Sequence, residues 1–356
     1  LDAGDARGVY RNTQLDLRNY KRMQMWIHAE SMIDNPTNLR SGELSLFMRL
    51  GTDIKSNYYE YEIPLALTPH GRYNSETQRD MVWPEQNRMD FVLSRLVELK
   101  KERNRERHNQ GSGVSFTTLY SQRDPDNEVN RMSVMGNPSL SDVRVILIGI
   151  RNNAATRRDG TVWVNELKVT DFDESGGWAA KANVNVGVSD IATLNMGAHI
   201  ETAGFGSVDQ PLNARRMDDY RQLNFAVQAD MGRFLPEKLK LKAPVYYSIA
   251  SEQTSPKYNP LDQDVLPKDA LDDASTKAER DSIKNYAIDK STVESFSISN
   301  LKFDIQSTNP KPWDPANFTL NYSFNKRKDQ DPTTEYEYTN DYRGSFQYTW
   351  TPYIKG

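Results

Sequence analysis

A regular alternation of apolar and polar residues runs through the second half of the chain and limits what it can fold into. In the first such segment Ala180, Val184 and Val188 fall on one side, and Lys181 and Asn185 fall on the other. A period of two residues is the signature of a β-strand. The alternating segments lie at 180–188, 193–201, 223–231, 241–249, 301–306, 318–325 and 345–350. The sequence therefore predicts about seven antiparallel strands over residues 174–356, forming a sheet with one apolar and one polar face.

Two environments produce such a sheet. A transmembrane β-strand has about 9–11 residues, apolar toward lipid and polar toward the lumen of a barrel. A soluble sheet with one face on a core gives the same pattern, so alternation alone leaves both open. The connections favour the barrel, because short or moderate ones (short at 189–190 and 232–238, moderate at 307–316) alternate with long ones (203–219, 251–295 and 326–340). Periplasmic turns and extracellular loops alternate in this way, so we expect transmembrane strands, with a helical excursion at 267–288.

The alternation also assigns each strand residue to a face. The residues expected to face the lumen are Lys181, Asn183, Asn185, Asn195, His199, Asn224, Gln228, Asn321, Ser323 and Gln347. The residues expected to face lipid are Val184, Val186, Leu194, Met196, Phe225, Val227, Leu320, Tyr322 and Phe324. Amide and hydroxyl side chains dominate the first set, which suits a water-filled interior.

Seven strands do not close such a barrel. Bacterial single-chain barrels have an even number of strands, eight or more. An open sheet edge cannot face lipid, because its backbone amides would stay unpaired. The chain also opens at Leu1 without an initiator methionine. We therefore expect the rest of the barrel to lie outside this chain. If the first turn is periplasmic, residues 1–173 belong at the extracellular mouth.

The first half, residues 1–173, predicts a different all-β structure. Alternating runs at 21–30, 44–50, 59–65 and 161–169, a continuous apolar run at 145–150, and weaker runs at 115–121 and 131–135 indicate about seven or eight strands. That number suits a jelly-roll-like β-sandwich. In the run 161–169 the apolar phase shifts between Val164 and Leu167. One extra residue in the ladder, a β-bulge, would explain the shift.

One segment of the first half has helical rather than strand periodicity. Met89, Leu93 and Leu96 form one stripe within residues 84–107, which predicts an amphipathic helix inserted between strands. Residues 100–107 are charged on every side. We interpret this charge run as the solvated end of the helix, and binding of an anionic partner is the alternative.

The sequence offers no site for catalysis or for a cofactor. The 45 basic and 49 acidic residues nearly balance, which gives no reason to expect nucleic acid as a partner. There is no cysteine, and no apolar run of about 18 residues that would form a transmembrane helix. The four histidines are scattered, and no known catalytic motif is present. Residues 124–128 predict a turn, with a cation site as the alternative. The carboxylate pair Glu60/Glu62 could suggest a glycosidase, but such pairs are expected by chance in a chain with 49 acidic residues. We therefore expect no enzyme activity, no metal and no cofactor.

A secreted glycan-binding protein is the competing class of function. Jelly-roll sandwiches often bind sugars, and Trp26, Tyr58 and Trp163 are candidate stacking residues. Packing in the core or at a sheet edge is the alternative role for these rings. Such a protein would purify without detergent and would bind polysaccharide.

Several long segments resemble a known family. They are Arg7–Glu30, Asn57–Leu65, Gly136–Asn152, Val162–Ala180 and Ser255–Asp264, the third of which reads GNPSLSDVRVILIGIRN. In these segments the chain closely resembles the SprA/Sov family, the outer-membrane translocons of the type 9 secretion system. The family's proteins are several times longer than this chain.

The resemblance implies a function that the residue patterns do not supply. It implies a single-chain outer-membrane barrel of large diameter with large inserts, acting in protein secretion and gliding motility. It implies export of folded cargo proteins that carry C-terminal sorting domains. The implied partners are a plug protein, a smaller shuttle barrel, other type 9 secretion components, and the lipid and lipopolysaccharide of the outer membrane. No catalytic role is implied.

Overall fold

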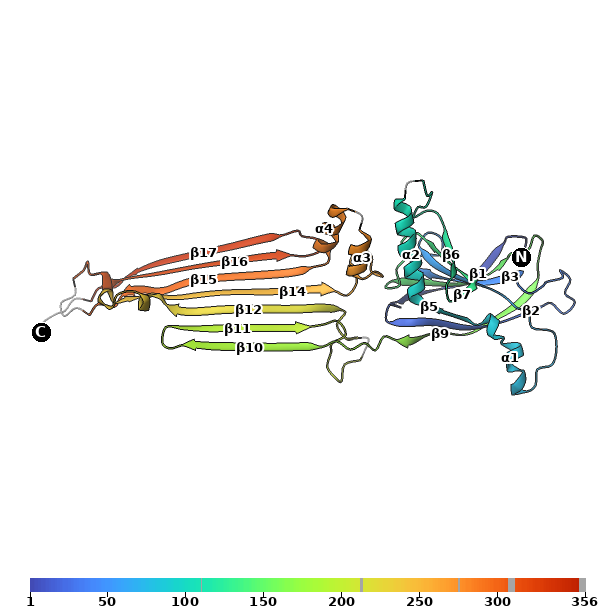
Figure 1. Cartoon of the computed structure of the whole chain (residues 1–356), viewed down its shortest axis with the longest axis horizontal. Helices are drawn as coiled ribbons and strands as arrows, with labels where there is room; N and C mark the ends of the chain where they lie inside the picture. The colour runs from blue at the N-terminus through green and yellow to red at the C-terminus, as the bar shows by residue number, and fades with distance from the viewer. Residues whose placement is uncertain (110, 212–213, 275, 307–310, 352–356) are drawn as a thin grey trace. The chain divides into compact units, whose positions relative to one another are not determined.

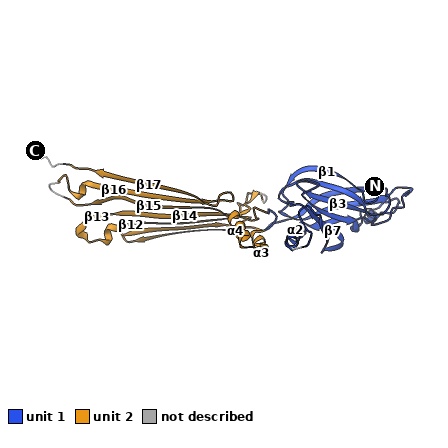
Figure 2. Ribbon diagram, turned by 90° about the horizontal axis from the view of Figure 1, so that it is seen from above, with its two compact units in different colours: residues 1–174, 262–265 blue, residues 175–261, 266–356 orange. Residues whose placement is uncertain are grey.

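The computed structural model describes residues 1–356 except 110, 212–213, 275, 307–310 and 352–356. Strands are the main elements of this part of the chain, which confirms the all-β prediction. Two compact units are present (Figure 2): residues 1–174 together with 262–265, and residues 175–261 together with 266–356. Within the described residues, no helix is long and apolar enough to cross a membrane.

The first unit contains two sheets. Among its described residues, a six-stranded antiparallel sheet has the order β1-β8-β3-β4-β7-β6, and a three-stranded sheet has the order β5-β2-β9. The strands are β1 Ala6–Leu15, β2 Tyr20–Ser31, β3 Leu44–Gly51, β4 Tyr58–Pro64, β5 Met89–Val92, β6 Tyr120–Asp124, β7 Asn127–Met135, β8 Val143–Asn152 and β9 Gly160–Phe172. The helices are α1 Arg79–Val82 and α2 Leu93–His108, with short 3-10 turns at Glu76–Gln78 and Glu85–Asn87.

The core lies between these two sheets. Alternate residues of β2, such as Met25 and Ile27, are almost completely buried, as are Leu46 and Met48 of β3. Each fully buried side chain of this kind contributes about 1.5–3 kcal/mol. Helix α2 adds Leu93, Leu96 and Leu99 to the same cluster. The sandwich prediction for the first half is thereby confirmed.

The predicted bulge lies in β9. Gln24 of β2 pairs with Lys168 and Trp26 pairs with Asn165, so two residues of β9 face the single residue between them on β2. Glu166 occupies the left-handed region with φ +56°, which a bulge residue adopts to place its neighbours back in register. The bulge keeps Val164, paired with Ile27, and Val169, paired with Met23, on the same side of the sheet.

The predicted helix over 84–107 is partly wrong. Met89–Val92 forms strand β5, which pairs with β2, and the helix begins only at Leu93. Met89 and Phe91 are both buried, as the period of two requires. The helical stripe was misleading because Met89 also lies four residues before Leu93, so one apolar residue fits both periods.

The interpretation of residues 100–107 as a solvated end is also wrong at two positions. The side chains of Lys100 and Arg103 are completely buried, on the same face of α2 as Leu96 and Leu99. Burial of a cation is costly unless it is paired. Lys100 forms ion pairs with Asp262 and Asp264, so the anionic partner of the charge run lies within this chain. Burial lowers the pKa of Arg103, which donates to the backbone oxygen of Gly136 at 2.7 Å.

The carboxylate pair Glu60/Glu62 is the centre of an ionic network. Both residues lie on the face of β4 that points away from the core, yet both are buried. Glu60 pairs with Arg49 at 2.7 Å and with Arg151 at 3.0 Å. Glu62 accepts hydrogen bonds from Ser45, Arg131 and Arg151. These ion pairs and hydrogen bonds give both carboxylates a structural role.

A pH-sensitive contact joins Glu43 to Arg158. The guanidinium donates to both carboxylate oxygens, at 2.6 and 2.8 Å. The hydrogen bond from Arg158, followed by that from the Arg40 backbone, lowers the pKa of Glu43 from 4.5 to about 2. Because the folded-state pKa lies below the unfolded one, this contact contributes its full stability above pH 4.5 and loses it as the pH falls toward 2.

We therefore expect Glu43→Gln to lower the melting temperature above pH 5 by a constant amount. The difference between the original chain and the variant should shrink as the pH falls from about 4.5 toward 2, because protonation of Glu43 progressively removes the ionic contact. Thermal unfolding monitored at several pH values measures this difference. A difference that stays constant over the whole window would show that Glu43 does not titrate as described.

The second unit is dominated by one large antiparallel sheet. Within its described residues the order is β10-β11-β12-β14-β15-β16-β17 (Figure 1). The short β13 pairs with β15. The strands are β10 Ala179–Val188, β11 Ala192–Glu201, β12 Asp218–Asp230, β13 Leu241–Lys242, β14 Pro244–Pro256, β15 Asp289–Phe303, β16 Phe318–Gln330 and β17 Glu337–Tyr348. Short 3-10 turns lie at Met231–Phe234, Glu237–Leu239 and Pro315–Asn317.

The connections differ from the prediction at two places. Strand β14 continues to Pro256 and β15 begins at Asp289, so residues 251–256 and 289–295 are strand rather than loop. Strand β16 continues to Gln330 and β17 begins at Glu337, so the last connection is short rather than long. The strict alternation of short and long connections is therefore wrong. Of the predicted connection 307–316, residues 307–310 lie outside the described residues.

The predicted helical excursion is confirmed. Helices α3 Pro267–Asp273 and α4 Lys277–Tyr286 lie in the connection between β14 and β15. Pro267 is at the first helical position, where its missing N–H costs nothing. The Thr276 hydroxyl caps α4 by accepting from the Glu279 amide at 3.2 Å.

Candidate functional site: a two-faced sheet

The register of the large sheet gathers the predicted polar residues on one face. Residues paired across antiparallel strands point to the same side of a sheet. Asn185 pairs with Asn195, Asn183 lies in the row of Asn224, and Lys181 pairs with His199. On β16 and β17, Ser323 pairs with Arg343 and Gln347 pairs with Thr319. All ten residues expected to face the lumen, Gln228 and Asn321 included, lie on this side, which we call the polar face. Whether it borders a lumen stays a prediction.

The predicted apolar residues gather on the opposite side, which we call the apolar face. Val184 pairs with Met196, which pairs with Phe225. The neighbouring row joins Val186, Leu194 and Val227, and it continues through Tyr247 and Phe296 to Phe324. Leu320 and Tyr322 lie on the same side of β16. Val184 is 47% exposed and Leu320 is 44% exposed, so the apolar face stays open to solvent in the isolated chain.

A bulge keeps the apolar face continuous on β15. Ile298 pairs with Tyr322, but Leu301 pairs with Leu320, so β15 has one residue more than β16 between these pairs. Asn300 adopts φ +54°, and its amide donates to the Asn321 side chain at 2.7 Å. Without the extra residue, Leu301 would point to the polar face.

Charged residues interrupt the apolar face at different rows on different strands. On β12 the first charged residue of this face is Arg221, four residues beyond Phe225. On β15 and β16 it is Glu294 and Lys326, which lie in the row of Phe225 itself. On β14 the same face has no charged residue through Ser255. The uncharged part of the apolar face therefore reaches further along β12 and β14 than along β15 and β16.

Aromatic rings stand at the borders of the apolar face on β16 and β17. At one border Phe318 contacts Phe346 and Tyr348, with ring centroids 5.5 and 5.2 Å apart. At the other, Lys326 and Lys328 lie over the ring of Tyr338. Rings and snorkelling cations in these places are typical of a membrane interface.

The polar face carries more charge than the sequence indicated. One row joins Lys181, His199, Gln222, Glu252, Ser291, Asp329 and Glu337. The His199 ring lies 3.0 Å from Glu201, which also pairs with Arg216 at 3.3 Å. Sequence reasoning missed Glu252 and Asp329 because it placed both in loops. Residues 251–256 (SEQTSP) and 326–330 (KRKDQ) show no apolar–polar alternation, so periodicity gave no signal for these strand ends.

Arginine side chains lie over two of the three candidate stacking rings of the first unit. The guanidinium of Arg88 lies 5.1 Å from the Trp26 ring centre, and that of Arg49 lies 4.0 Å from the Tyr58 ring centre. Only Trp163 of the three is largely open, at 60% exposure. Two of the three rings are thus already covered by arginine.

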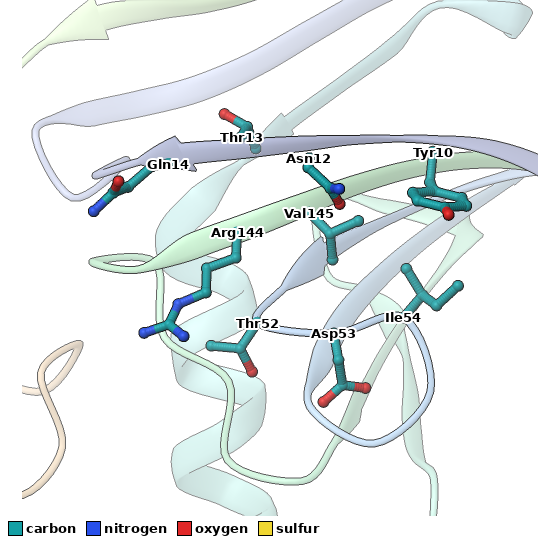
Figure 3. A pocket seen from close by; sticks show the side chains of 9 residues that line it. All are labelled: Tyr10, Asn12, Thr13, Gln14, Thr52, Asp53, Ile54, Arg144 and Val145. Atoms are coloured by element: carbon teal, nitrogen blue, oxygen red, sulfur yellow. The ribbon is translucent and has the colours of Figure 1, made fainter.

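An open groove lies elsewhere on the first unit (Figure 3). Its volume is about 680 Å³, and Tyr10, Asn12, Thr52, Asp53 and Arg144 are among its lining residues. Asp53 accepts from the backbone amides of residues 55 and 56, and Arg144 pairs with Asp142 at 2.7 Å. These two charges are therefore committed to local structure.

The candidate cation turn is a hairpin turn. Pro125 and Asp126 connect β6 to β7. Asp124 is buried and accepts from the Tyr61 hydroxyl at 2.5 Å, and Asp126 pairs with Arg95 at 3.0 Å. In the part of the chain that the structure describes, no three His, Asp or Glu side chains come together as metal ligands.

The comparisons with known proteins agree with the resemblance. The family model described as SprA_N, motility related/secretion protein, matches residues 1–271. This match covers the whole sandwich and continues through β14 into α3. No curated protein matches the chain. Because the match spans well over half of the residues, the chain belongs to the SprA_N family of motility-related and secretion proteins.

Proposed function

We propose that this chain is a segment of a very large outer-membrane β-barrel that forms the pore for export of folded proteins in type 9 secretion. The observation that carries the proposal is the two-faced sheet with its continuous apolar face. An apolar face of this extent has no place on a soluble protein unless a partner covers it. A bilayer covers it without a specific partner.

The edges of the sheet require more strands. Strands β10 and β17 each pair on one side only within the described residues. Inside a membrane both edges must be paired. We infer that further strands of the same barrel pair with them. The barrel would then be wider than these strands alone could enclose, as the transport of folded cargo demands.

The connections suggest an orientation. Connections 202–217 and 257–288 lie at the end of the sheet where β10 begins, as does the short connection 331–336, and the tight turn 189–191 lies at the other end. Long loops of outer-membrane barrels are extracellular and short turns are periplasmic. The sandwich of residues 1–174 would then stand at the extracellular mouth, at the cell surface, where antibody can reach it on intact cells.

The partners follow from the same proposal. Cargo proteins with C-terminal sorting domains would pass along the polar face, and a plug protein, a shuttle barrel and other type 9 secretion components would act at the mouths. Lipid and lipopolysaccharide would contact the apolar face.

Leucine on the polar face tests this pore. We expect Asn183→Leu combined with Asn185→Leu to slow export several-fold. Each leucine offers an apolar contact of up to about 1.5–3 kcal/mol to passing cargo, so cargo would dissociate from the polar face more slowly. The measurement is the rate at which a cargo protein appears outside the cell, with the amount of full-length protein in the outer-membrane fraction held equal.

The matched control changes the other face. Val184→Leu combined with Val186→Leu adds a similar apolar volume where lipid is expected, and it should leave export unchanged. If the polar-face pair exports normally, or if both pairs slow export equally, the polar face does not line the path of the cargo.

A further inference from the structure

The first unit includes four residues that come from far along the chain. Asp262–Val265 belongs to this unit, whereas the residues on both sides of it belong to the second unit. The four residues lie in the connection 257–288 between β14 and β15. We call them the latch segment.

The Asp264 carboxylate is held by four donors. It accepts from Lys100 Nζ at 3.0 Å, the Tyr59 hydroxyl at 2.8 Å, the Ser139 hydroxyl at 2.8 Å and the Leu140 amide at 2.7 Å. Its side chain is completely buried. A buried carboxylate with this many donors occupies a built site, because each oxygen is saturated with hydrogen bonds.

The Lys100 ammonium binds the same segment. It has three donors, and the structure gives it three acceptors: Asp262 at 2.6 Å, Asp264 at 3.0 Å and the Pro138 backbone oxygen at 3.0 Å. The side chain is completely buried. Burial, the charge of Asp264 and its hydrogen bond together raise the pKa of Tyr59 well above its ordinary value, so the phenol stays protonated and keeps donating.

The residue between the two aspartates, Gln263, is also bound by the first unit. The Gln263 side-chain oxygen accepts from the Ser141 hydroxyl at 2.7 Å, and its backbone oxygen accepts from Arg18 at 3.2 Å. Val265 is 6% exposed and is the one apolar side chain of the segment. Helix α2, strand β4 and residues 138–141 therefore recognise an Asp-x-Asp sequence through both charge and backbone.

We propose that this recognition site is a releasable latch, which fixes the α3–α4 connection to the sandwich and lets it go without unfolding either sheet. The contacts of the segment are mainly ionic and only one apolar side chain is buried. Buried ion pairs specify geometry strongly but add little net stability, because desolvation offsets their attraction. A segment held in this way can leave while the apolar core stays intact.

The proposal goes beyond the pore and does not depend on it. In the proposed barrel, the connection 257–288 would lie at the same end as the other long loop. Release of the latch would then change which surface the mouth presents. The latch itself stands on the contacts of the first unit alone.

The chain has no cysteine, so one introduced thiol reports on one place. We choose Val265→Cys in the latch segment, Val134→Cys in the core at 0% exposure, and Val208→Cys in a loop at 100% exposure. Maleimide labelling of full-length protein, measured on the peptides of this chain by mass spectrometry, gives a rate for each site. We expect the rate at position 265 to lie between the other two. Protection at 265 as complete as at 134 would show that the segment never leaves by itself, and would overturn the proposal.

Lys100→Met and Asp264→Asn should then release the segment. We expect either change to raise the labelling rate at position 265 by about tenfold or more, as the loss of charge-assisted hydrogen bonds implies, with position 134 still protected. Lys268→Met and Asp272→Asn make the same replacements at exposed positions of α3 and should change neither rate. A joint rise at 265 and 134 would mean that the segment is an integral part of the core. No rise at 265 would mean that the ion pairs do not hold it. Either result would refute the latch.

Discussion

Replacing Glu60 by glutamine is expected to destabilise the six-stranded sheet of the first unit by about 3 kcal/mol. Breaking a buried ion pair costs about 3–5 kcal/mol, because the remaining charge loses both its partner and water. Glu60 is 1% exposed, whereas Arg49 and Arg151 keep 21% and 19% of their side-chain exposure. These two cations can recover some hydration, so the lower end of the range applies. Arg151 also keeps its contact with Glu62.

Amide hydrogen exchange in full-length protein measures this effect. Peptides that cover β4 and β8 should exchange about a hundredfold faster in Glu60→Gln, as a loss of about 3 kcal/mol implies. The control is Glu98→Gln, which breaks the exposed pair with Arg95, whose glutamate is 57% exposed. An exposed pair contributes about 0–1 kcal/mol, so its exchange should barely change. Similar effects in both variants would show that burial does not set the strength of the network.

The strands that the sequence predicted best are those with one apolar face on the core. Strands β2, β3 and β4 place alternate apolar residues on the core side, so a period of two appears in their sequences. Strand β1 was missed because it is the exposed edge of its sheet, with Val9 at 74% and Tyr10 at 62% exposure. An edge strand gains its hydrogen bonds from one neighbour and needs no apolar side, so its sequence carries little periodicity.

The buried cations of α2 could not be predicted from their neighbours. Lys100 stands in a run of charged residues, and every local rule places such a run in water. Its partners Asp262 and Asp264 follow more than 160 residues later. A contact between positions so far apart depends on the folded topology, which periodicity does not encode.

The sequence pattern did not predict the ends of the long strands, for a related reason. On the apolar face, Glu294 lies opposite Ile249 and pairs with Lys326 on the next strand. Such residues interrupt the apolar–polar alternation although the hydrogen-bond ladder continues. The faces of the residues inside the alternating runs could be assigned from parity alone, because a strand reverses its side chains at every residue.

A substitution on the apolar face is expected to have a free-energy effect of similar size. Val227→Arg should sharply reduce the amount of folded protein in the outer membrane. Val227 lies in the central row of the apolar face, between Leu194 and Tyr247. An arginine that faces lipid near the middle of the membrane costs about 2–4 kcal/mol. On an interior strand such as β12, the side chain has neighbours on both sides and little freedom to reach the interface.

The matched control is the next residue. Gln228→Arg introduces the same cation on the same strand, but Gln228 belongs to the polar face and pairs with Thr193 and Tyr246. Water in a lumen solvates that arginine, so assembly should be nearly unchanged. Resistance of the folded barrel to detergent at low temperature, measured on outer-membrane fractions, separates folded from unfolded protein. If Gln228→Arg is the harmful change, the two faces are reversed. If the variants fail equally, the sheet has no lipid-facing side and the apolar face must be covered by protein. The comparison therefore decides between bilayer and protein as the cover of this face, which the sequence pattern alone leaves open.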